Sequence, residues 1–169
     1  YRYMESNMDR KQFFNSKIQN METLLKLLLS QRIHRPIDIL CHTKCQLNHS
    51  GVYTFSVYEK GVEKFLYVGQ SGNIGQRLQE HCAIKNHNAA NFAYKVTVER
   101  SGLEPIAYSP HSTKKSMFSI PDFKDCFDEV VNDIKQMNYR WIPIANALEK
   151  NLFEIYASVV LDSKYNNFD

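Results

Sequence analysis

The sequence predicts one small α/β domain of the α+β type, in which an antiparallel sheet of three to four strands is flanked by helices. Its 169 residues, of which 43% are hydrophobic, are enough for a single core. Residues 51–69 are rich in β-branched and aromatic side chains around a central glycine, which is typical of a β-hairpin. Four other segments, at 16–31, 74–83, 122–138 and 145–161, carry apolar residues at helical spacing.

The hairpin is the clearest local feature of the chain. The stretch GVYTFSVY forms the first predicted strand, EKGV holds the glycine for the reversal, and EKFLYVG forms the second strand. A turn near residues 60–62 makes Tyr53 and Tyr67 approximate cross-strand partners. The hairpin therefore predicts two phenols close together.

A short helix is expected directly after the hairpin. The stretch QSGN breaks the second strand, and Asn73 is a plausible N-cap for a helix that begins near Ile74. Arg77 and His81 lie four residues apart on this helix, so they project from one face. Arginine binds phosphate oxygens bidentately, and histidine or tyrosine moves protons, so this corner suits phosphodiester chemistry.

The remaining elements are predicted from pattern alone. The stretch NFAYKVTV at 91–98 alternates well enough for a third strand, and residues 139–142 are a candidate for an additional one. The helix at 16–31 is interpreted as packing its leucines on the core, with a recognition or dimerisation helix as the alternative. Asp122 is expected to cap the helix over 122–138.

Residues 99–121 read as a long irregular loop with three prolines. The loop contains Lys114 and Lys115 together with aromatic residues, a composition suited to holding a phosphate backbone or stacking a base. A solvated insertion without a role explains the same composition equally well.

Charge and cysteine usage set broad limits on the partner and the compartment. A net charge of +3 and a pI near 8.6 permit a nucleic-acid partner without requiring one. The cysteines show no disulfide spacing, and no secretory signal or transmembrane run is present, which favours a cytoplasmic, reducing location without a membrane partner. The segment CHTKCQLNH at 41–49 lacks a standard zinc spacing and is interpreted as a loop.

The order of these residues resembles a known family. Gly51-Val52-Tyr53, then Tyr67-Val68-Gly69, then Arg77 and His81 are similar to the core of the GIY-YIG nuclease superfamily. The phrase YVGQSGNIGQRLQEH matches that core in the order and spacing of nearly every functional position. The resemblance implies a GIY-YIG-like fold and a metal-dependent DNA endonuclease, restriction-like or stand-alone.

The resemblance also implies a role for each residue. Tyr53 or Tyr67 receives or relays the proton of the attacking water, and Arg77 clamps the scissile phosphate. His81 hydrogen-bonds a tyrosine or relays a proton. Glu149 alone holds Mg2+ or Mn2+, the hydrated, oxygen-liganded type of site that one carboxylate supports.

Glu149 is chosen over Glu154 by resemblance only. The two glutamates lie roughly 140° apart on one helix and do not share a face. The phrase Leu148-Glu149-x-x-Leu152 is similar to the metal-holding helix of the family, which leaves Glu154 as an exposed surface charge. The resemblance also implies an asparagine near the end of the chain that supports the active site, either Asn166 or Asn167. The sequence distance from Glu149 to this asparagine is longer than the resemblance implies.

The resemblance leaves other points open. Ser71 and Asn73 either line the site or, as favoured for Asn73, cap the helix. The predicted organisation is a helical extension at 1–48 and a nuclease domain at 49–169 with an insertion at about 99–138. The alternatives are a catalytically silent nucleic-acid-binding module on the same fold and an unrelated α/β interaction domain. A double-strand cut implies a homodimer or two successive events.

Overall fold

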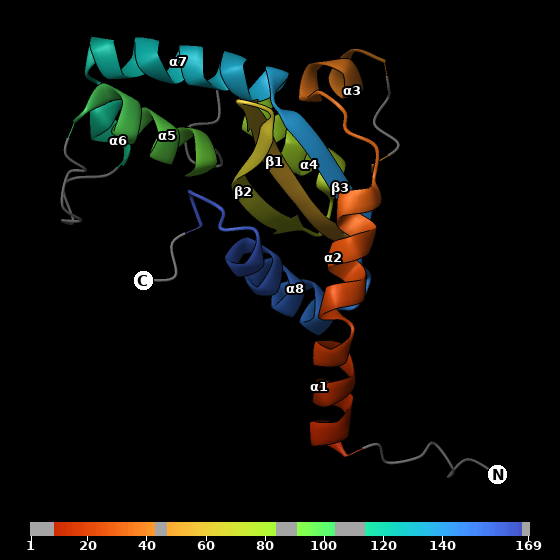
Figure 1. Ribbon diagram of the computed structural model, residues 1–169. Helices are drawn as coiled ribbons and strands as arrows, with labels where there is room; N and C mark the ends of the chain where they lie inside the picture. Colours follow the sequence, from red (N-terminus) through yellow and green to blue (C-terminus); the bar gives the residue numbers. More distant parts are fainter. Residues whose placement is uncertain (1–8, 43–46, 84–90, 104–113, 167–169) are drawn as a thin grey trace.

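The computed structural model describes residues 9–42, 47–83, 91–103 and 114–166 (Figure 1). Its elements, in chain order, are α1 (Arg10–Gln19), α2 (Met21–Ser30), α3 (Pro36–His42), β1 (Gly51–Glu59), β2 (Val62–Ser71), α4 (Ile74–Cys82), α5 (Asn91–Ser101), α6 (Lys114–Met117), α7 (Pro121–Gln136), β3 (Asn138–Pro143) and α8 (Ala147–Val160). No helix of the described ranges is long and apolar enough to cross a membrane.

The sheet has three antiparallel strands in the order β2-β1-β3. Its third strand is β3, which contains residues 139–142, the segment predicted as an additional strand. The predicted strand at 91–98 is wrong, because these residues form α5. The side chains that α5 buries are Phe92, Ala93, Val96 and Thr97, which share one helical face. Packing of that face on the core therefore outweighs the β-propensity of its valines and threonine.

The β-hairpin turns at Lys60 and Gly61, whose φ angles are 51° and 80°. Positive φ at both central positions is the type I′ geometry that matches the twist of a two-residue hairpin. Further along, a bulge makes Leu66 the unpaired residue, because Phe55 pairs with Tyr67 while Ser56 pairs with Phe65. The prediction was that Tyr53 and Tyr67 are approximate cross-strand partners, and this register makes them diagonal neighbours.

The bulge decides which face Tyr67 occupies. In the observed register Tyr53 pairs with Gly69 and Phe55 with Tyr67, so both tyrosines lie on the same face. An uninterrupted ladder from the turn would place Tyr67 opposite Thr54 and on the other face, since a slip of one residue reverses every side chain. The extra residue at Leu66 is therefore what brings the two phenols together.

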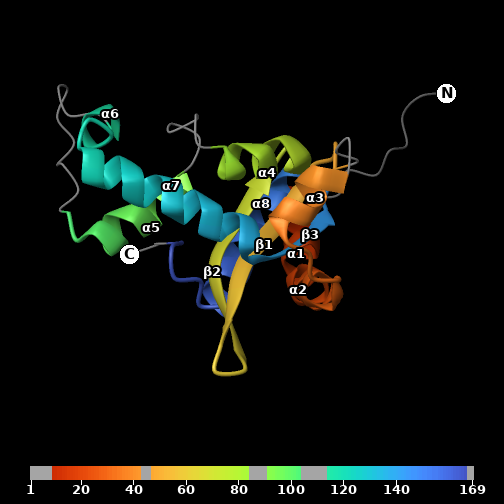
Figure 2. The ribbon, with the colours of Figure 1, turned by 90° about the horizontal axis from the view of Figure 1, so that it is seen from above.

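Helices cover both faces of the sheet (Figures 1 and 2). The face with the tyrosines packs against α3, α4, α5 and α7 in one core, and the opposite face packs against α2 and α8 in another. The second core is built around Val52, Val68 and Ile142, with Leu28 from α2 and Phe153 from α8. The sheet thus separates the helix that carries Arg77 from the helix that carries both glutamates.

The predicted helices differ from the observed ones at their ends. The segment 16–31 is two helices, α1 and α2, which meet at Asn20, and α1 extends away from the body of the domain (Figure 1). Ile120 is the N-cap of α7, and Pro121 is its first helical residue. The prediction that Asp122 caps this helix is therefore wrong, because Asp122 lies in the first turn. Part of the predicted loop at 99–121 lies outside the described residues, namely 104–113. The same is true of residues 43–46 in the segment CHTKCQLNH.

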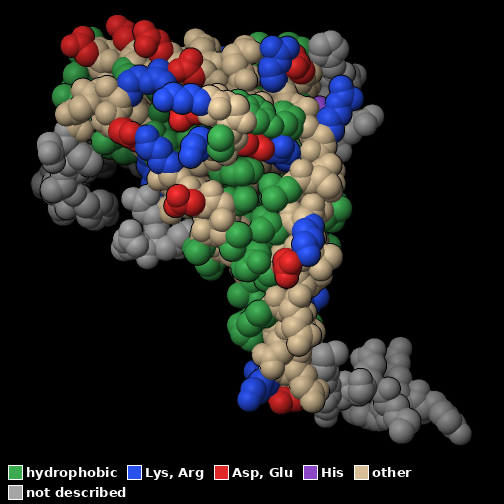
Figure 3. Space-filling model, in the orientation of Figure 1, with side chains coloured by type: hydrophobic (Ala, Val, Ile, Leu, Met, Phe, Trp, Pro, Cys, Tyr) green, Lys and Arg blue, Asp and Glu red, His purple; other side chains and the backbone are tan. Residues whose placement is uncertain are grey.

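The outer side of α8 is apolar. Ile155, Val159 and Val160 are exposed to 49, 61 and 53%. Figure 3 shows hydrophobic side chains gathered over this helix below the sheet. The helix therefore contributes its buried face to the core and retains an apolar face toward solvent.

Candidate active site

The candidate site lies at the outer edge of β2, where the Tyr53 ring crosses the strand. A Cβ atom added to Gly69 would lie 2.4 Å from the Tyr53 hydroxyl and 2.5 Å from its Cζ atom. Only a glycine leaves room for this crossing. The phenol of central strand β1 thereby reaches past its neighbour toward the edge strand.

His81 meets the Tyr53 hydroxyl from α4. Its Nε2 atom lies 2.8 Å from Tyr53 Oη, and the imidazole is fully buried among the rings of Phe55, Tyr67 and Phe92. Burial, reinforced by the positive charge of Arg77, lowers the pKa of His81 to about 3. Nδ1 has no hydrogen-bond partner among the described residues. His81 is therefore a neutral partner of Tyr53 at neutral pH.

Arg77 lies one helical turn before His81. Its Nη1 atom is 2.8 Å from Oε2 of Glu80, and its side chain is 21% exposed. Burial opposes the charged form, but the hydrogen bond to Glu80 and the nearby Tyr53 and Tyr67 phenols leave the pKa of Arg77 raised. The guanidinium therefore stays charged beside the two phenols.

Both phenols are neutral at neutral pH. Burial raises the pKa of Tyr53 and of Tyr67 above the usual value, and the charge and hydrogen bonding of Arg77 act in the opposite direction without cancelling it. The two rings lie 6.4 Å apart. This arrangement offers two hydroxyl groups and one fixed cation at the end of the β-hairpin.

The carboxylate whose charge acts on this group is Glu154 of α8. The prediction that Glu154 is an exposed surface charge is wrong, since it is half-buried. Burial raises the pKa of Glu154 above its usual value. Hydrogen bonds from Gln70 and the charges of Lys150 and Arg77 offset only part of this rise. Its charge in turn acts on Tyr53 and on Tyr67. The charges of Glu154 and Arg77 thus act on each other, although their helices lie on opposite faces of the sheet.

Glu149 has other partners. Its Oε1 atom accepts a hydrogen bond of 2.9 Å from Asn20 Nδ2, and its Oε2 atom lies 3.5 Å from Lys17 Nζ. Its backbone amide donates to the Asn146 side chain, the N-cap of α8. Glu149 therefore joins the junction of α1 and α2 to α8. The signal that could have favoured Glu154 is the long gap from Glu149 to Asn166.

Asn166 supports β2 from outside the sheet. Its side chain accepts a hydrogen bond from the Val68 amide and donates one to the Val68 carbonyl, each of 2.7 Å. Ser163 Oγ also donates to the Asn166 side chain. This pairing satisfies an outward-facing peptide group next to Tyr67, as a further strand would. Asn167 lies outside the described residues.

Asn73 and Ser71 shape the turn between β2 and α4. Asn73 is the N-cap of α4 and accepts from the Gln76 amide at 2.9 Å, as expected. Ser71 Oγ lies in the same turn and donates to the Asn73 carbonyl. Lys114 and Lys115 begin α6, and the structure does not describe their side chains.

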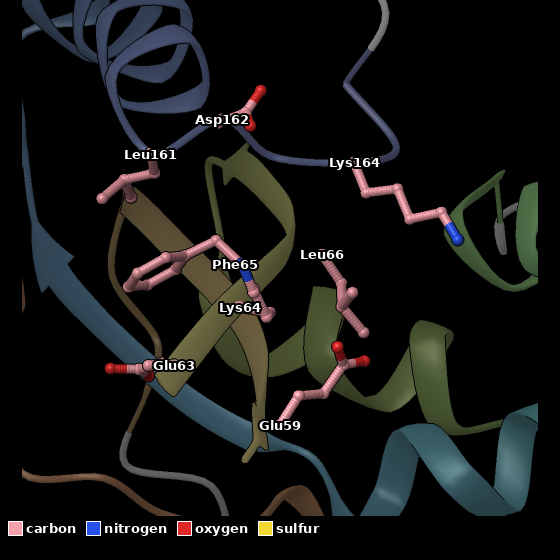
Figure 4. A pocket seen from close by; sticks show the side chains of 8 residues that line it. All are labelled: Glu59, Glu63, Lys64, Phe65, Leu66, Leu161, Asp162 and Lys164. Atoms are coloured by element: carbon pink, nitrogen blue, oxygen red, sulfur yellow. The ribbon is translucent and has the colours of Figure 1, made fainter. Parts of the chain in front are cut away.

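A separate hollow of about 370 Å³ lies between β2 and the end of α8 (Figure 4). It is lined by Glu59, Glu63, Lys64, Phe65, Leu66, Leu161, Asp162 and Lys164. None of the tyrosines, Arg77 or His81 lines it. The candidate site is thus an edge built from converging side chains, separate from this hollow.

Comparison with protein-family models gives a match to the GIY-YIG catalytic domain over residues 49–120. The matched segment contains Tyr53, Tyr67, Arg77 and His81, and the match confirms the resemblance noted in the sequence. The three-stranded antiparallel sheet flanked by helices is consistent with that fold. Comparison with curated proteins and with solved structures gave no match.

Proposed function

Because residues 49–120 match the catalytic domain of a nuclease family, we propose that the chain is a divalent-metal-dependent endonuclease that hydrolyses phosphodiester bonds in DNA. One observation carries the proposal. The charges of a guanidinium from α4 and a carboxylate from α8, helices on opposite faces of the sheet, act on the same pair of phenols. Hydrolysis of a phosphodiester needs a cation on the phosphate, a route for the proton of water, and neutralisation of the developing charge.

Arg77 supplies the cation. Its guanidinium is charged at neutral pH, and its planar fork suits two oxygens of one phosphate. The hydrogen bond to Glu80 fixes the side chain on α4 before substrate arrives. A phosphate bound there would lie beside the hydroxyls of Tyr53 and Tyr67.

The tyrosine–histidine pair supplies the proton route. When the Tyr53 hydroxyl donates to neutral His81, the lone pairs of the phenol oxygen can accept a hydrogen bond from water. The low pKa of His81 makes it an orienting partner of Tyr53. Tyr67 is less buried than Tyr53, which leaves it better able to contact substrate.

We propose that Glu154 holds the metal ion, in place of Glu149. The described residues contain no cluster of three carboxylate, histidine or cysteine side chains, and Glu154 is the carboxylate whose charge acts on both phenols. A single carboxylate suits Mg2+ or Mn2+, which keep most of their water ligands. The ion would stabilise negative charge on the phosphate and the leaving oxygen. Both oxygens of Glu149 are already bound by Asn20 and Lys17.

Cleavage of supercoiled plasmid tests this proposal. We expect nicking or linearisation with Mg2+ or Mn2+ that disappears in EDTA and in the Glu154→Gln variant, which keeps the shape of the side chain. The matched Glu149→Gln variant, from the same helix, is expected to retain the cut. Retention of activity in Glu154→Gln together with its loss in Glu149→Gln would reverse the assignment.

The pattern of products separates the remaining alternatives. Discrete fragments would indicate a restriction-like enzyme, and scattered nicks would indicate general degradation. One site cuts one strand, so direct linearisation without a nicked intermediate would indicate two copies acting together. Intact plasmid with salt-dependent binding would favour the catalytically silent binding module.

A further inference from the structure

We propose that Lys150 is an additional phosphate-binding residue, which contacts the nucleic-acid backbone next to the phosphate held by Arg77. This inference rests on the proposed function and extends it to substrate binding. It assigns to α8 a second role besides presenting Glu154. The supporting observations are the position of Lys150, its hydrogen bond to Ser50 and the charges around Glu154.

Lys150 lies one helical turn before Glu154 and therefore on the same face of α8. Its Nζ atom donates a hydrogen bond of 3.0 Å to Ser50 Oγ, directly before the first residue of β1. Lys150 is half-buried. The lysine is thus held against the end of the β-hairpin, close to where β2 and α4 meet.

Lys150 differs from the other half-buried cations around α8 and α4. Lys17 forms an ion pair with Glu149, and Arg77 forms one with Glu80. Within the described ranges, Lys150 forms no salt bridge, and its hydrogen-bond partner is the neutral hydroxyl of Ser50. The charge of Lys150 acts on Glu154 without a salt bridge between the two, so the ammonium keeps the capacity to contact an arriving phosphate.

Two positive charges near Glu154 could each bind a phosphate of the nucleic-acid backbone. The positive charges of Lys150 and Arg77 both act on Glu154, one from each face of the sheet. A strand of DNA that places one phosphate on Arg77 continues along the β2 edge toward Lys150. Arginine clamps one phosphate bidentately, whereas lysine acts as a point charge.

Equilibrium binding tests the assignment without requiring cleavage. The probe is a fluorescein-labelled DNA duplex of mixed sequence in EDTA, with anisotropy followed between about 50 and 200 mM KCl. Lys150→Gln removes the charge while keeping a side chain able to reach Ser50, and Lys150→Arg keeps the charge. Lys124→Ala is the matched control, because Lys124 is an exposed lysine on α7.

Loss of one phosphate contact has a defined signature. For Lys150→Gln we expect the slope of log Kd against log[KCl] to be smaller by about 0.9. Binding should then be about 15-fold weaker at 50 mM salt and about 4-fold weaker at 200 mM. Lys150→Arg and Lys124→Ala should follow the wild-type chain. Thermal unfolding of each variant verifies that the fold is kept, and a Ser50→Ala variant that weakens binding as much as Lys150→Gln would show a structural role and overturn the proposal.

Two failures remain distinguishable. If the wild-type chain binds the duplex and Lys150→Gln binds it equally well, the inference about Lys150 is wrong and the proposed nuclease stands. If the wild-type chain neither binds the duplex nor cleaves plasmid, the proposed function fails and the inference fails with it.

Discussion

Burial of His81 makes the stability of the protein depend on pH in a defined direction. Its pKa falls from 6.5 to about 3 on folding. As the pH decreases, the unfolded chain therefore takes up the proton first, so the stabilisation is complete above about pH 6.5 and is lost as the pH falls toward 3. Proton uptake by His81 in the unfolded chain therefore lowers the free energy of unfolding by about 2 kcal/mol between pH 7 and pH 5.

Replacing His81 by glutamine removes this titration while leaving a side chain that can hydrogen-bond the Tyr53 hydroxyl. Urea unfolding followed by the fluorescence of Trp141, the single tryptophan, gives the free energy of unfolding at each pH. We expect His81→Gln to be less stable overall, but with a loss between pH 7 and pH 5 that is smaller than the wild-type loss by about 2 kcal/mol.

A matched control removes a different imidazole. His34 packs on Trp141 at the far strand of the sheet, and the full pH slope should persist in His34→Gln because His81 is still present. The same slope in wild type and His81→Gln would show that His81 is not buried in its neutral form. The pairing with Tyr53 proposed for the proton route would then lose its basis.

Three further substitutions test how the structure holds the site. Gly69→Ala should cost about 1–3 kcal/mol and reduce activity, since its methyl group would collide with the Tyr53 ring; thermal unfolding and plasmid cleavage measure the two effects. Glu63→Gln should cost about 3–5 kcal/mol in urea unfolding, because it leaves the buried Arg140 guanidinium unpaired, and unchanged stability would contradict a buried pair. Lys60→Asn should stabilise the hairpin by about 0.5–1 kcal/mol, because asparagine tolerates a positive φ better than lysine does, and a lower midpoint in urea would refute this.

Features encoded by neighbouring residues were predictable from the sequence. The β-hairpin, its turn, the N-cap at Asn73 and the placement of Arg77 and His81 on one face of α4 all follow from spacing and local propensity. Their interactions span a few positions along the chain. The sequence pattern therefore contained the information needed to place them.

Features decided by distant packing were not predictable in this way. The bulge at Leu66 shows only in the paired register, and the burial of one face of α5 is decided by α7 and the sheet. The choice between Glu149 and Glu154 depends on what lies opposite each face of α8. Glu149 faces the junction at Asn20, whereas Glu154 faces the β2 edge, and no local pattern records which side is occupied.

The edge of β2 also explains how far the functional unit must extend. The family match ends at residue 120, before β3 and α8. Yet β1 is the central strand and needs β3 as its second partner, and the outward-facing groups of Val68 and Gln70 are bound by Asn166 and Glu154. An unprotected edge strand would invite pairing with other chains. The same contacts that protect this edge bring the carboxylate beside the phenols, so the catalytic unit that we propose runs from the hairpin to Asn166.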